Sequence, residues 1–413
     1  MFELELEWDR PAKLLGHQTK HVLRVRIRPQ TGGASGLPVR VAVALDTSIS
    51  MAGEKLERAK EACQAVVSQL RREDKLSLAG FATKVSPLLE NLAGGEGAAK
   101  RAKTALSQLR AAGCTRTDLA LEWMKEALPA ERGVARAGIL ITDGHATNLK
   151  GSVLDENDRK LLIEKVEQFS SEGIMVCAVG LGNAANFNRD FLVKLSDSGK
   201  GGFVYANTPE ALEPELGKKL ASCQAFVTVG GKILLAPSAG VRVEGFCRFR
   251  PEYMPLEESA PNELSLGAIR ADTPTDLLVE VSIPPGQIGE STGNRDVISV
   301  QLEADILAKP VAATAGIYQT NGYGESQKIN PEVNRDRLCW DINVCNDDLT
   351  GTDDPKRTGE LLENMQAAAL RAGEMQIAGQ AKLQLDELKK TGQLNPDGVT
   401  KMLRDSRKLG GDA

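Results

Sequence analysis

The sequence is poor in aromatic residues and in long apolar runs, and each shortage excludes a class of protein. Aromatic residues make up 4% of the 413 residues, whereas glycine contributes 40, a composition that favours loop-rich α/β and β structure over a helical bundle. No stretch approaches the run of about 18 apolar residues that a membrane-spanning helix needs. With a net charge of −5 and no cluster of lysines and arginines, the chain lacks the basic surface expected of a protein that binds nucleic acid or membranes.

Signals for secretion and for redox or nucleotide chemistry are also missing. Residues 1–8 alternate apolar and acidic side chains, which predicts a strand and not a signal peptide. The 7 cysteines are an odd number, and several lie within apolar patterns, which indicates reduced, buried thiols and a cytoplasmic protein. C-x-x-C, P-loop and strand-associated G-x-G-x-x-G motifs are absent from the sequence, so it gives no support for a redox or nucleotide-binding enzyme.

The length and the order of patterns predict several domains. Strands alternate with helices over residues 38–223, which predicts an α/β domain with a doubly wound, mostly parallel sheet. Short β-rich segments over residues 225–345 predict an antiparallel β-sandwich. We expect residues 1–35 to supply further strands of this sandwich, because a two-stranded hairpin is marginal alone. The α/β domain is then an insertion in the sandwich, and residues 355–410 form a C-terminal helical segment.

The region between the sandwich and the helices is harder to assign. Residues 310–335 are rich in Gly, Asn and Tyr, which predicts a long loop with a strand or two. The segment L-C-W-D-I-N-V at residues 338–344 is a candidate strand, although it could equally lie in the loop. N-P-D-G at residues 395–398 predicts the start of the last helix.

The rest of the chain is organised around V-R-V-A-V-A-L-D-T-S-I-S-M, residues 39–51. The apolar run predicts a buried strand of a parallel sheet, and it brings Asp46, Ser48 and Ser50 to the carboxyl end of that strand. Open α/β sheets bind ligands at this edge, and a carboxylate with two hydroxyls forms a hard-oxygen cluster that suits Mg²⁺. The alternative is that these side chains only cap the next helix.

Two further segments carry matching oxygen-rich side chains. One is G-C-T-R-T-D at residues 113–118, and the other is I-T-D-G at residues 141–144. Because strand ends next to the central strand converge on one crevice, the three loops could surround one cation. The predicted metal site consists of Asp46, Ser48, Ser50, Thr115 and Asp143.

These motifs resemble the von Willebrand factor A family. The similar segments are D-T-S-I-S-M, G-C-T-R-T-D-L-A-L and I-L-I-T-D-G, with G-L-G-N-A-A-N-F-N-R-D-F-L and G-G-F-V-Y-A as the late strands. The resemblance covers about residues 38–223 and implies a metal-ion-dependent adhesion site. In such a site Ser48, Ser50 and Thr115 would contact Mg²⁺, or Mn²⁺ or Ca²⁺ at the same place, while Asp46 and Asp143 would act largely through water.

Some positions depart from the family pattern. Ile49 and Cys114 stand where glycine is common in the family, which leaves every oxygen position intact. Thr117 offers a second hydroxyl two residues after Thr115, and the pattern favours Thr115.

The resemblance implies a protein–protein interaction or adaptor protein of an intracellular prokaryotic type, working beside AAA+ chaperones or in bacterial stress and defence complexes. A site with two carboxylates leaves a divalent cation partly uncompensated, so a partner's Glu or Asp would supply the last ligand. We expect no enzyme, because no nucleophile–base set is present and His145 alone among the histidines lies near the crevice, as a rim residue. A metal-assisted hydrolase on the same oxygens and a self-assembling structural protein remain alternatives.

Overall fold

The computed structural model describes residues 2–30, 36–286, 291–349, 351–352 and 354–411. The chain divides into two compact units, one formed by residues 35–229 and the other by residues 1–34 together with 230–413. Within the described residues, none of the helices combines the length and the apolarity that crossing a membrane requires.

The first unit is built on a mixed sheet that is mostly parallel. Its strand order is β6-β5-β4-β7-β8-β9, and β6 alone runs antiparallel to its neighbour. The strands are β4 (Val39–Asp46), β5 (Lys75–Phe81), β6 (Val85–Ala93), β7 (Ala135–Thr142), β8 (Ile174–Leu181) and β9 (Lys200–Ala206). Every residue of β4 is buried, as expected for a central strand covered on both faces.

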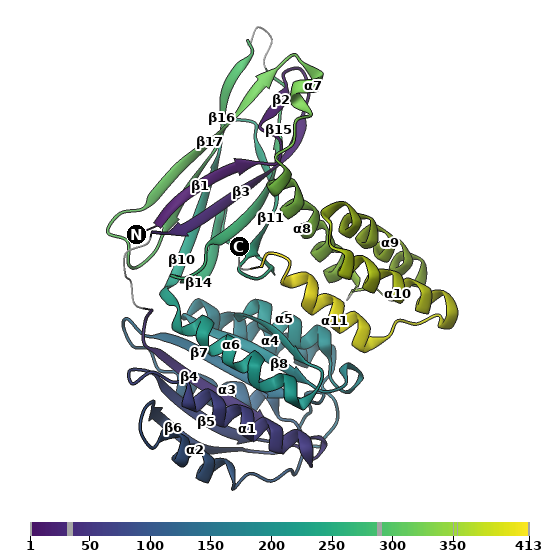
Figure 1. The fold of residues 1–413 in the computed structure, drawn as a ribbon. Helices are drawn as coiled ribbons and strands as arrows, with labels where there is room; N and C mark the ends of the chain where they lie inside the picture. Colours follow the sequence, from purple (N-terminus) through teal and green to yellow (C-terminus); the bar gives the residue numbers. More distant parts are fainter. Residues whose placement is uncertain (1, 31–35, 287–290, 350, 353, 412–413) are drawn as a thin grey trace. The chain divides into compact units, whose positions relative to one another are not determined.

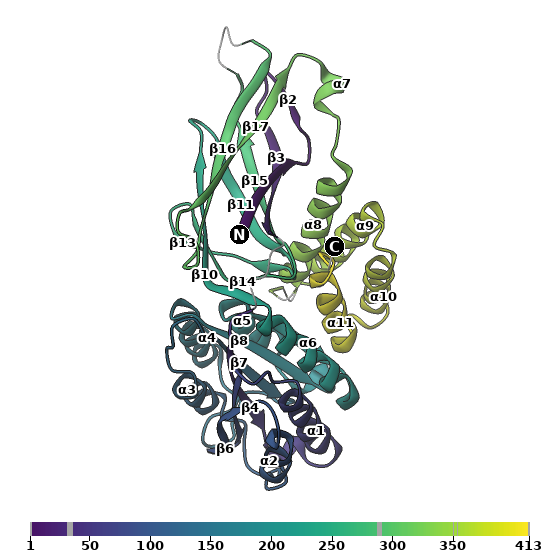
Figure 2. The same cartoon turned by 60° about the vertical axis from the view of Figure 1, so that its left-hand side comes forward.

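Helices cover both faces of this sheet (Figure 2). Helix α1 packs against α2 and α6, and α4 packs against α3 and α5. Their bounds are α1 (Glu54–Ser68), α2 (Ala98–Leu106), α3 (Thr117–Ala127), α4 (Glu156–Ser171), α5 (Arg189–Ser198) and α6 (Leu212–Gln224), with short 3₁₀ turns η1 (Ile49–Met51), η2 (Ala184–Asn186) and η3 (Pro209–Ala211). The predicted doubly wound α/β fold is therefore confirmed.

The second unit holds two largely antiparallel sheets (Figure 1). One has the order β1-β3-β15-β11-β12, with β1 (Phe2–Trp8), β3 (Thr19–Pro29), β15 (Thr275–Ile283), β11 (Arg242–Arg250) and β12 (Met254–Pro255). The other has the order β13-β14-β10-β16-β17-β2, with β13 (Glu258–Ala260), β14 (Glu263–Arg270), β10 (Phe226–Pro237), β16 (Gly293–Glu303), β17 (Val311–Thr320) and β2 (Ala12–Leu14). The indole of Trp8 on β1 donates to the Gly316 carbonyl on β17 at 2.8 Å and so links the two sheets.

Helices complete the second unit. They are α7 (Tyr323–Ser326), α8 (Pro331–Leu349), α9 (Pro355–Ala372), α10 (Met375–Thr391) and α11 (Pro396–Arg407). Residues 338–344 form neither the candidate strand nor the alternative loop, because they lie within α8, and this helix begins at Pro331, ahead of the segment expected from residue 355. Helix α8 buries Leu338, Cys339 and Ile342. Ile342 belongs to a core among α8–α11, and Cys339 belongs to a core between α8 and the sheet β1-β3-β15-β11-β12.

Buried ion pairs fix α8 to that sheet. Asp336 on α8 accepts two hydrogen bonds from the Arg250 guanidinium, at 2.8 and 2.9 Å, and one from Arg24 at 2.9 Å. Arg250 also donates to Asp276, which accepts two bonds from Arg26. Because Asp336, Asp276, Arg24 and Arg250 are all buried, these charges depend on one another for compensation.

Candidate metal centre

The ends of two neighbouring parallel strands form the base of the site. Strand β4 ends at Asp46 and β7 ends at Thr142, one residue before Asp143. Leu45 and Ile141 are paired in register, so the two aspartates leave the same edge of the sheet. Both aspartates are fully buried, which requires that each carboxylate be compensated locally.

Asp46 is held by protein donors on both carboxylate oxygens. Its Oδ1 accepts from the Ser48 backbone N–H at 2.7 Å, and its Oδ2 accepts from the Thr142 hydroxyl at 2.6 Å. Burial raises the pKa of Asp46 to about 6, and the nearby charge of Asp143 adds to the rise, while the bonds from Thr142 and Ser48 oppose it. Asp46 therefore orients the loop that follows it through hydrogen bonds.

The two serines connect this loop to Asp143. The Ser48 and Ser50 hydroxyl oxygens lie 3.0 Å apart, and Ser50 Oγ donates to Asp143 Oδ1 at 2.7 Å. Ser48 is buried while Ser50 is exposed, so the chain of oxygens runs from the interior to the surface. Ser50 is therefore within hydrogen-bond distance of both Ser48 and Asp143.

Thr115 reaches the same place from a different loop. A Cβ built on Gly144 would lie 3.4 Å from Ser50 Oγ and 3.5 Å from Thr115 Oγ1, so both hydroxyls border the small space above this glycine. The loop is held there because the Thr115 N–H donates to Thr147 Oγ1 at 2.9 Å and the Thr147 N–H donates to the Thr115 carbonyl at 2.8 Å.

The turn before Thr115 requires glycine. Gly113 has a φ of +82°, and a Cβ there would lie 2.3 Å from Thr83 Oγ1, so both the conformation and the available space exclude a side chain. The Gly113 carbonyl accepts from the Ile49 N–H at 3.2 Å. The loops that carry Ser48, Ser50 and Thr115 are thereby tied directly to each other.

The donor set fits a hard divalent cation. Two carboxylates and three hydroxyls, with no nitrogen or sulfur donor in the predicted set, are the ligand types that Mg²⁺ accepts. Glycine at position 144 leaves room beside two of the hydroxyls. Hydrogen bonds connect Asp46, Ser48, Ser50 and Asp143, and Thr115 shares with Ser50 the space above Gly144.

Three residues that contact the site were not predicted from the sequence. Thr142 orients Asp46, and Thr147 holds Thr115. The Lys55 ammonium on α1 donates to Asp143 Oδ2 and, at 3.3 Å, to the Ser50 carbonyl. Thr142 lies in the motif I-L-I-T-D-G and could have been found there. Lys55 lies in the first turn of an amphipathic helix, and nothing in the sequence indicates that its side chain points back to the end of a strand.

The remaining sequence-predicted residues border the centre. Cys114 is half-buried, with its Sγ 3.6 Å from Thr83 Oγ1. His145 is half-buried, and its Nδ1 has no hydrogen-bond partner among the residues that the structure describes. Ile49 is 74% exposed. Thr117 is buried, and its N–H donates to the Thr115 carbonyl at 3.1 Å, which leaves Thr115 as the hydroxyl beside Gly144.

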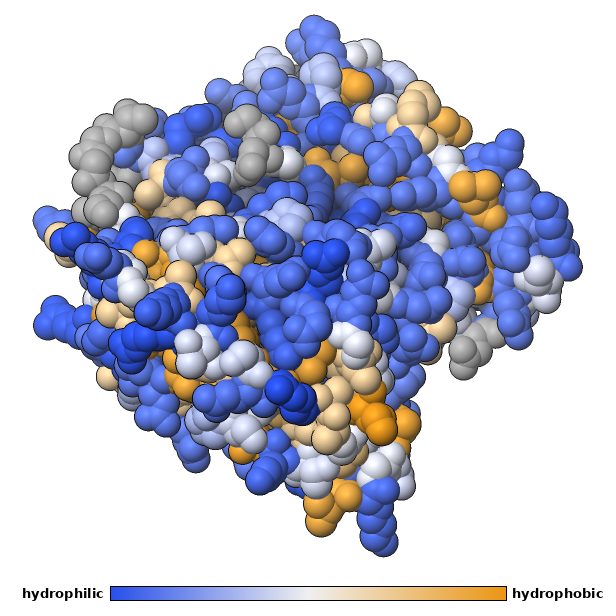
Figure 3. Space-filling view, turned by 60° about the horizontal axis from the view of Figure 1, so that its bottom comes forward, coloured by the Kyte–Doolittle hydropathy of each residue, from blue (hydrophilic) through white to orange (hydrophobic). Residues whose placement is uncertain are grey.

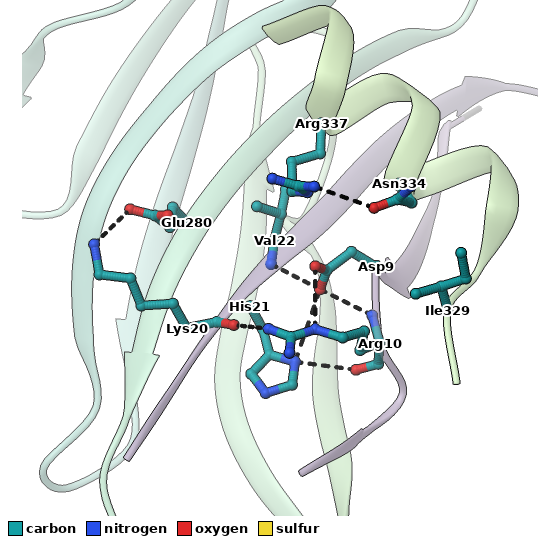
Figure 4. Close-up of a pocket in the computed structure, with 9 residues that line it drawn as sticks. All are labelled: Asp9, Arg10, Lys20, His21, Val22, Glu280, Ile329, Asn334 and Arg337. Atoms are coloured by element: carbon teal, nitrogen blue, oxygen red, sulfur yellow. Dashed lines mark hydrogen bonds and ion pairs between the residues drawn. The ribbon is translucent and has the colours of Figure 1, made fainter. Parts of the chain in front are cut away.

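A second hollow lies in the other unit, away from these motifs. It is a pocket of about 350 Å³ lined by charged side chains of β3, β15, α8 and the segment between β1 and β2 (Figure 4). Its charges are paired with one another, since Lys20 contacts Glu280 at 3.1 Å and Arg10 contacts Asp9 at 3.6 Å. The pocket is therefore a set of internally compensated charges.

Comparison with known proteins finds a family model that matches most of the α/β unit. The family model described as von Willebrand factor type A domain matches residues 41–216. An uncharacterized protein of Synechocystis sp. is 29% identical over 262 residues, which cover 61% of this chain and 59% of the relative. The uncharacterized protein YfbK of Escherichia coli is 26% identical over 219 residues, 52% of this chain and 36% of the relative. The chain thus matches between about a third and three fifths of the lengths of these curated relatives.

Two solved structures are similar over nearly the whole chain. A von Willebrand factor type A protein from Catenulispora acidiphila has a TM-score of 0.77 at 16% identity, covering 98% of this chain and 97% of its own. The ArnB paralog VWA2 from Sulfolobus acidocaldarius has a TM-score of 0.61 at 15% identity, with complete coverage of both chains. At this identity the similarity concerns the fold, and it extends beyond residues 41–216 to the sheets and helices of the second unit.

Proposed function

We propose, from the match of residues 41–216 to the von Willebrand factor type A domain model, that the protein binds a protein partner through a divalent cation. The ligands would be Ser48, Ser50 and Thr115, with Asp46 and Asp143 acting largely through water. The cation would be Mg²⁺, or Mn²⁺ or Ca²⁺ at the same site. When bound, it supplies a positive charge and an open coordination position for a carboxylate of the partner.

One observation carries the proposal, which is the continuous contact among oxygens from the loops that meet here. Asp46 accepts from the Ser48 N–H, Ser48 Oγ contacts Ser50 Oγ, and Ser50 Oγ donates to Asp143. A helix cap would need only one of these oxygens, bonded to an N–H of the helix. Ser48, which precedes η1, makes no side-chain capping bond, and the residue before α1 is Gly53, which has no side chain, so capping does not explain the cluster.

The surface around the centre favours a partner with apolar side chains beside its acidic residue. Ile49, Leu149 and Val153 are 74%, 68% and 55% exposed. Ile49 is bonded to the Gly113 carbonyl, and the short hairpin that carries Leu149 and Val153 packs on Cys114 and Thr115. Figure 3 shows one face of the molecule, mostly hydrophilic with separate apolar groups. From the exposure of Ile49, Leu149 and Val153 we propose a few apolar contacts around a charged centre.

We propose further that the protein binds a partner and does not catalyse a reaction. Its setting in this proposal is the cytoplasm, in a bacterial stress, defence or AAA+ chaperone-linked complex. None of the seven cysteines, all of them among the described residues, forms a disulfide, which supports a reducing compartment. The absence of a nucleophile–base pair in the predicted ligand set supports binding.

Calorimetric titration of the full chain with Mn²⁺ tests the metal step. We expect uptake of one ion, loss of that uptake in Ser50→Ala, and unchanged uptake in Ser68→Ala, a control whose hydroxyl bonds only within α1. Unchanged folding of both variants is checked by circular dichroism. Capture of partners from the host lysate by immobilised protein, with Mg²⁺ or with EDTA, tests the interaction step. Binding that survives EDTA and Ser50→Ala would contradict the proposal.

A further inference from the structure

A cationic side chain already lies at the proposed metal centre. Lys55 is the second residue of α1, and its ammonium donates to Asp143 Oδ2. The other oxygen of that carboxylate accepts from Ser50 Oγ at 2.7 Å. Asp143 is thus shared between a predicted metal ligand and a lysine.

The lysine is held at this place by the fold. Its Cε lies 3.7 Å from the position of a Cβ on Gly182, the residue after β8, whose φ is +84°. Its ammonium makes a second bond to the Ser50 carbonyl at 3.3 Å. The side chain is 30% exposed, whereas Asp143 is fully buried, so Lys55 covers one side of the carboxylate and still contacts solvent.

We infer that Lys55 sets the net charge of this centre so that a divalent cation is held firmly only together with a carboxylate from the partner. Asp46 and Asp143 supply two negative charges, and Lys55 cancels one of them. A divalent cation in the centre then has one uncompensated positive charge, which an incoming Glu or Asp neutralises. Without Lys55 the two aspartates would match the formal charge of the cation, so the uncompensated positive charge expected from the two carboxylates alone arises only when Lys55 is counted. The inference rests on the proposed function and adds the reason why metal and partner would bind together.

The position of this lysine on α1 allows a matched comparison. Lys55→Met removes the charge but keeps an unbranched side chain, and Lys55→Gln is a second neutral variant. Lys55→Arg keeps the charge. Arg58→Met removes a positive charge from the same helix at a position that pairs with Glu61 at 2.9 Å and not with Asp143.

The experiment is calorimetric titration of these full-length variants with Mn²⁺ in a buffer without carboxylates, repeated with saturating acetate as a stand-in for the partner's side chain. We expect Lys55→Met and Lys55→Gln to bind Mn²⁺ at least tenfold more tightly than the wild type, and Lys55→Arg and Arg58→Met to stay within threefold of it. Acetate should tighten Mn²⁺ binding to the wild type several-fold more than to Lys55→Met.

The outcomes separate this inference from the proposed function. If the wild type binds Mn²⁺ and Lys55→Met binds it equally or more weakly, the role of Lys55 is refuted while the metal site stands. If neither the wild type nor either neutral variant takes up Mn²⁺, the proposed function fails and the inference fails with it. Uptake by the neutral variants alone would support the inference in its strongest form.

Discussion

The Thr142 hydroxyl donates a 2.6 Å hydrogen bond to the Asp46 carboxylate across two adjacent parallel strands. Both residues are the last of their strands, β4 and β7, and both are buried. The bond fixes one carboxylate oxygen, while the Ser48 N–H fixes the other. Asp46 therefore has no rotational freedom with which to place the Ser48–Ser50 loop differently.

Removing this donor should weaken both the fold and the metal site. We expect Thr142→Val to lower the free energy of unfolding by about 1–3 kcal/mol, because a buried carboxylate oxygen loses its partner, and to weaken Mn²⁺ binding. Urea denaturation and calorimetry measure the two effects. Thr104→Val is the control, since that hydroxyl is exposed and bonds only to the Lys100 carbonyl. Equal behaviour of the two variants would contradict the role given to Thr142.

Alanine substitutions at Gly133 and Gly113, which have similar φ angles, separate the cost of a left-handed backbone from the cost of a steric clash. Gly133 has a φ of +73° and no atom within 4 Å of the place that a Cβ would take, whereas at Gly113 that place lies 2.3 Å from Thr83 Oγ1. Gly133→Ala should cost about 1–2 kcal/mol for its left-handed backbone. Gly113→Ala should cost about 1–3 kcal/mol more, because Thr83 must move, and it alone should weaken Mn²⁺ binding. Thermal denaturation with and without Mn²⁺ separates the two variants.

Asp336 and Glu332 both pair with Arg24, but they differ in burial. Asp336→Ala removes the buried partner of Arg250 and Arg24, and we expect a loss of about 3–5 kcal/mol in the stability of the unit that contains α8. Glu332 has a side chain that is 77% exposed, so Glu332→Ala should cost less than about 1 kcal/mol. Urea denaturation measures both. A small effect of Asp336→Ala would mean that water replaces the missing carboxylate.

His21 makes the second unit sensitive to acid. Its Nδ1 lies 3.1 Å from the Arg10 carbonyl, an acceptor, so Nδ1 carries the proton of a neutral ring (Figure 4). Burial, with the charge of Arg10, lowers the pKa of His21 from the ordinary value of 6.5 to about 3. Between these values the unfolded chain binds a proton that the folded chain does not, so stability falls as the pH falls from 6.5 towards 3.

The full effect of His21 would be on the order of 5 kcal/mol at the acid end, and it is absent well above the ordinary pKa of histidine. Burial raises the pKa of Asp9, which acts in the opposite direction as the pH falls and reduces the slope. Melting temperatures between about pH 7.5 and about pH 4.5 should fall less steeply in His21→Gln than in the wild type. Parallel curves for the two proteins would exclude His21 as the cause.

The exposed apolar side chain of Ile49 should matter for binding and not for folding. Ile49→Ser is expected to change stability by less than about 0.5 kcal/mol and to weaken capture of the partner in the presence of Mg²⁺. Leu161→Ser on α4 is the control, since Leu161 is 62% exposed and lies outside the three loops of the site. Equal loss of capture in both variants would indicate a general effect of surface hydrophobicity.

The sequence predicts the α/β unit well because each of its elements has a single strong pattern. The apolar run within residues 39–51, for example, forms the predicted buried strand, β4. The five oxygen-bearing residues are also brought together, because the end of a parallel strand fixes where its loop begins. The contacts of Thr142, Thr147 and Lys55 depend on side-chain directions across the site, which spacing along the chain does not contain.

The error at residues 338–344 has a different physical cause. The run L-C-W-D-I-N-V has alternating apolar residues over a short window, and such a window does not separate a strand from a helix that is buried on two sides. In α8, Cys339 packs against the sheet β1-β3-β15-β11-β12, while Ile342 packs against the other helices. Because α8 is in contact on two faces, apolar residues occur on both of them, and the 3.6-residue period of a helix with one apolar face is lost.

The long separation between β3 and β15 affects how the protein emerges from the ribosome. β3 is complete at residue 29, but its neighbour β15 begins at residue 275, so the first hairpin is synthesised long before the strand that will cover it. The cross-strand neighbours Glu3 and Arg28, Glu5 and Arg26, and Glu7 and Arg24 place a glutamate on β1 opposite each arginine, so β3 itself carries Arg24, Arg26 and Arg28 along the waiting edge. Such charges discourage pairing with the edge of another nascent chain, and they protect the hairpin during the interval in which the inserted domain is made.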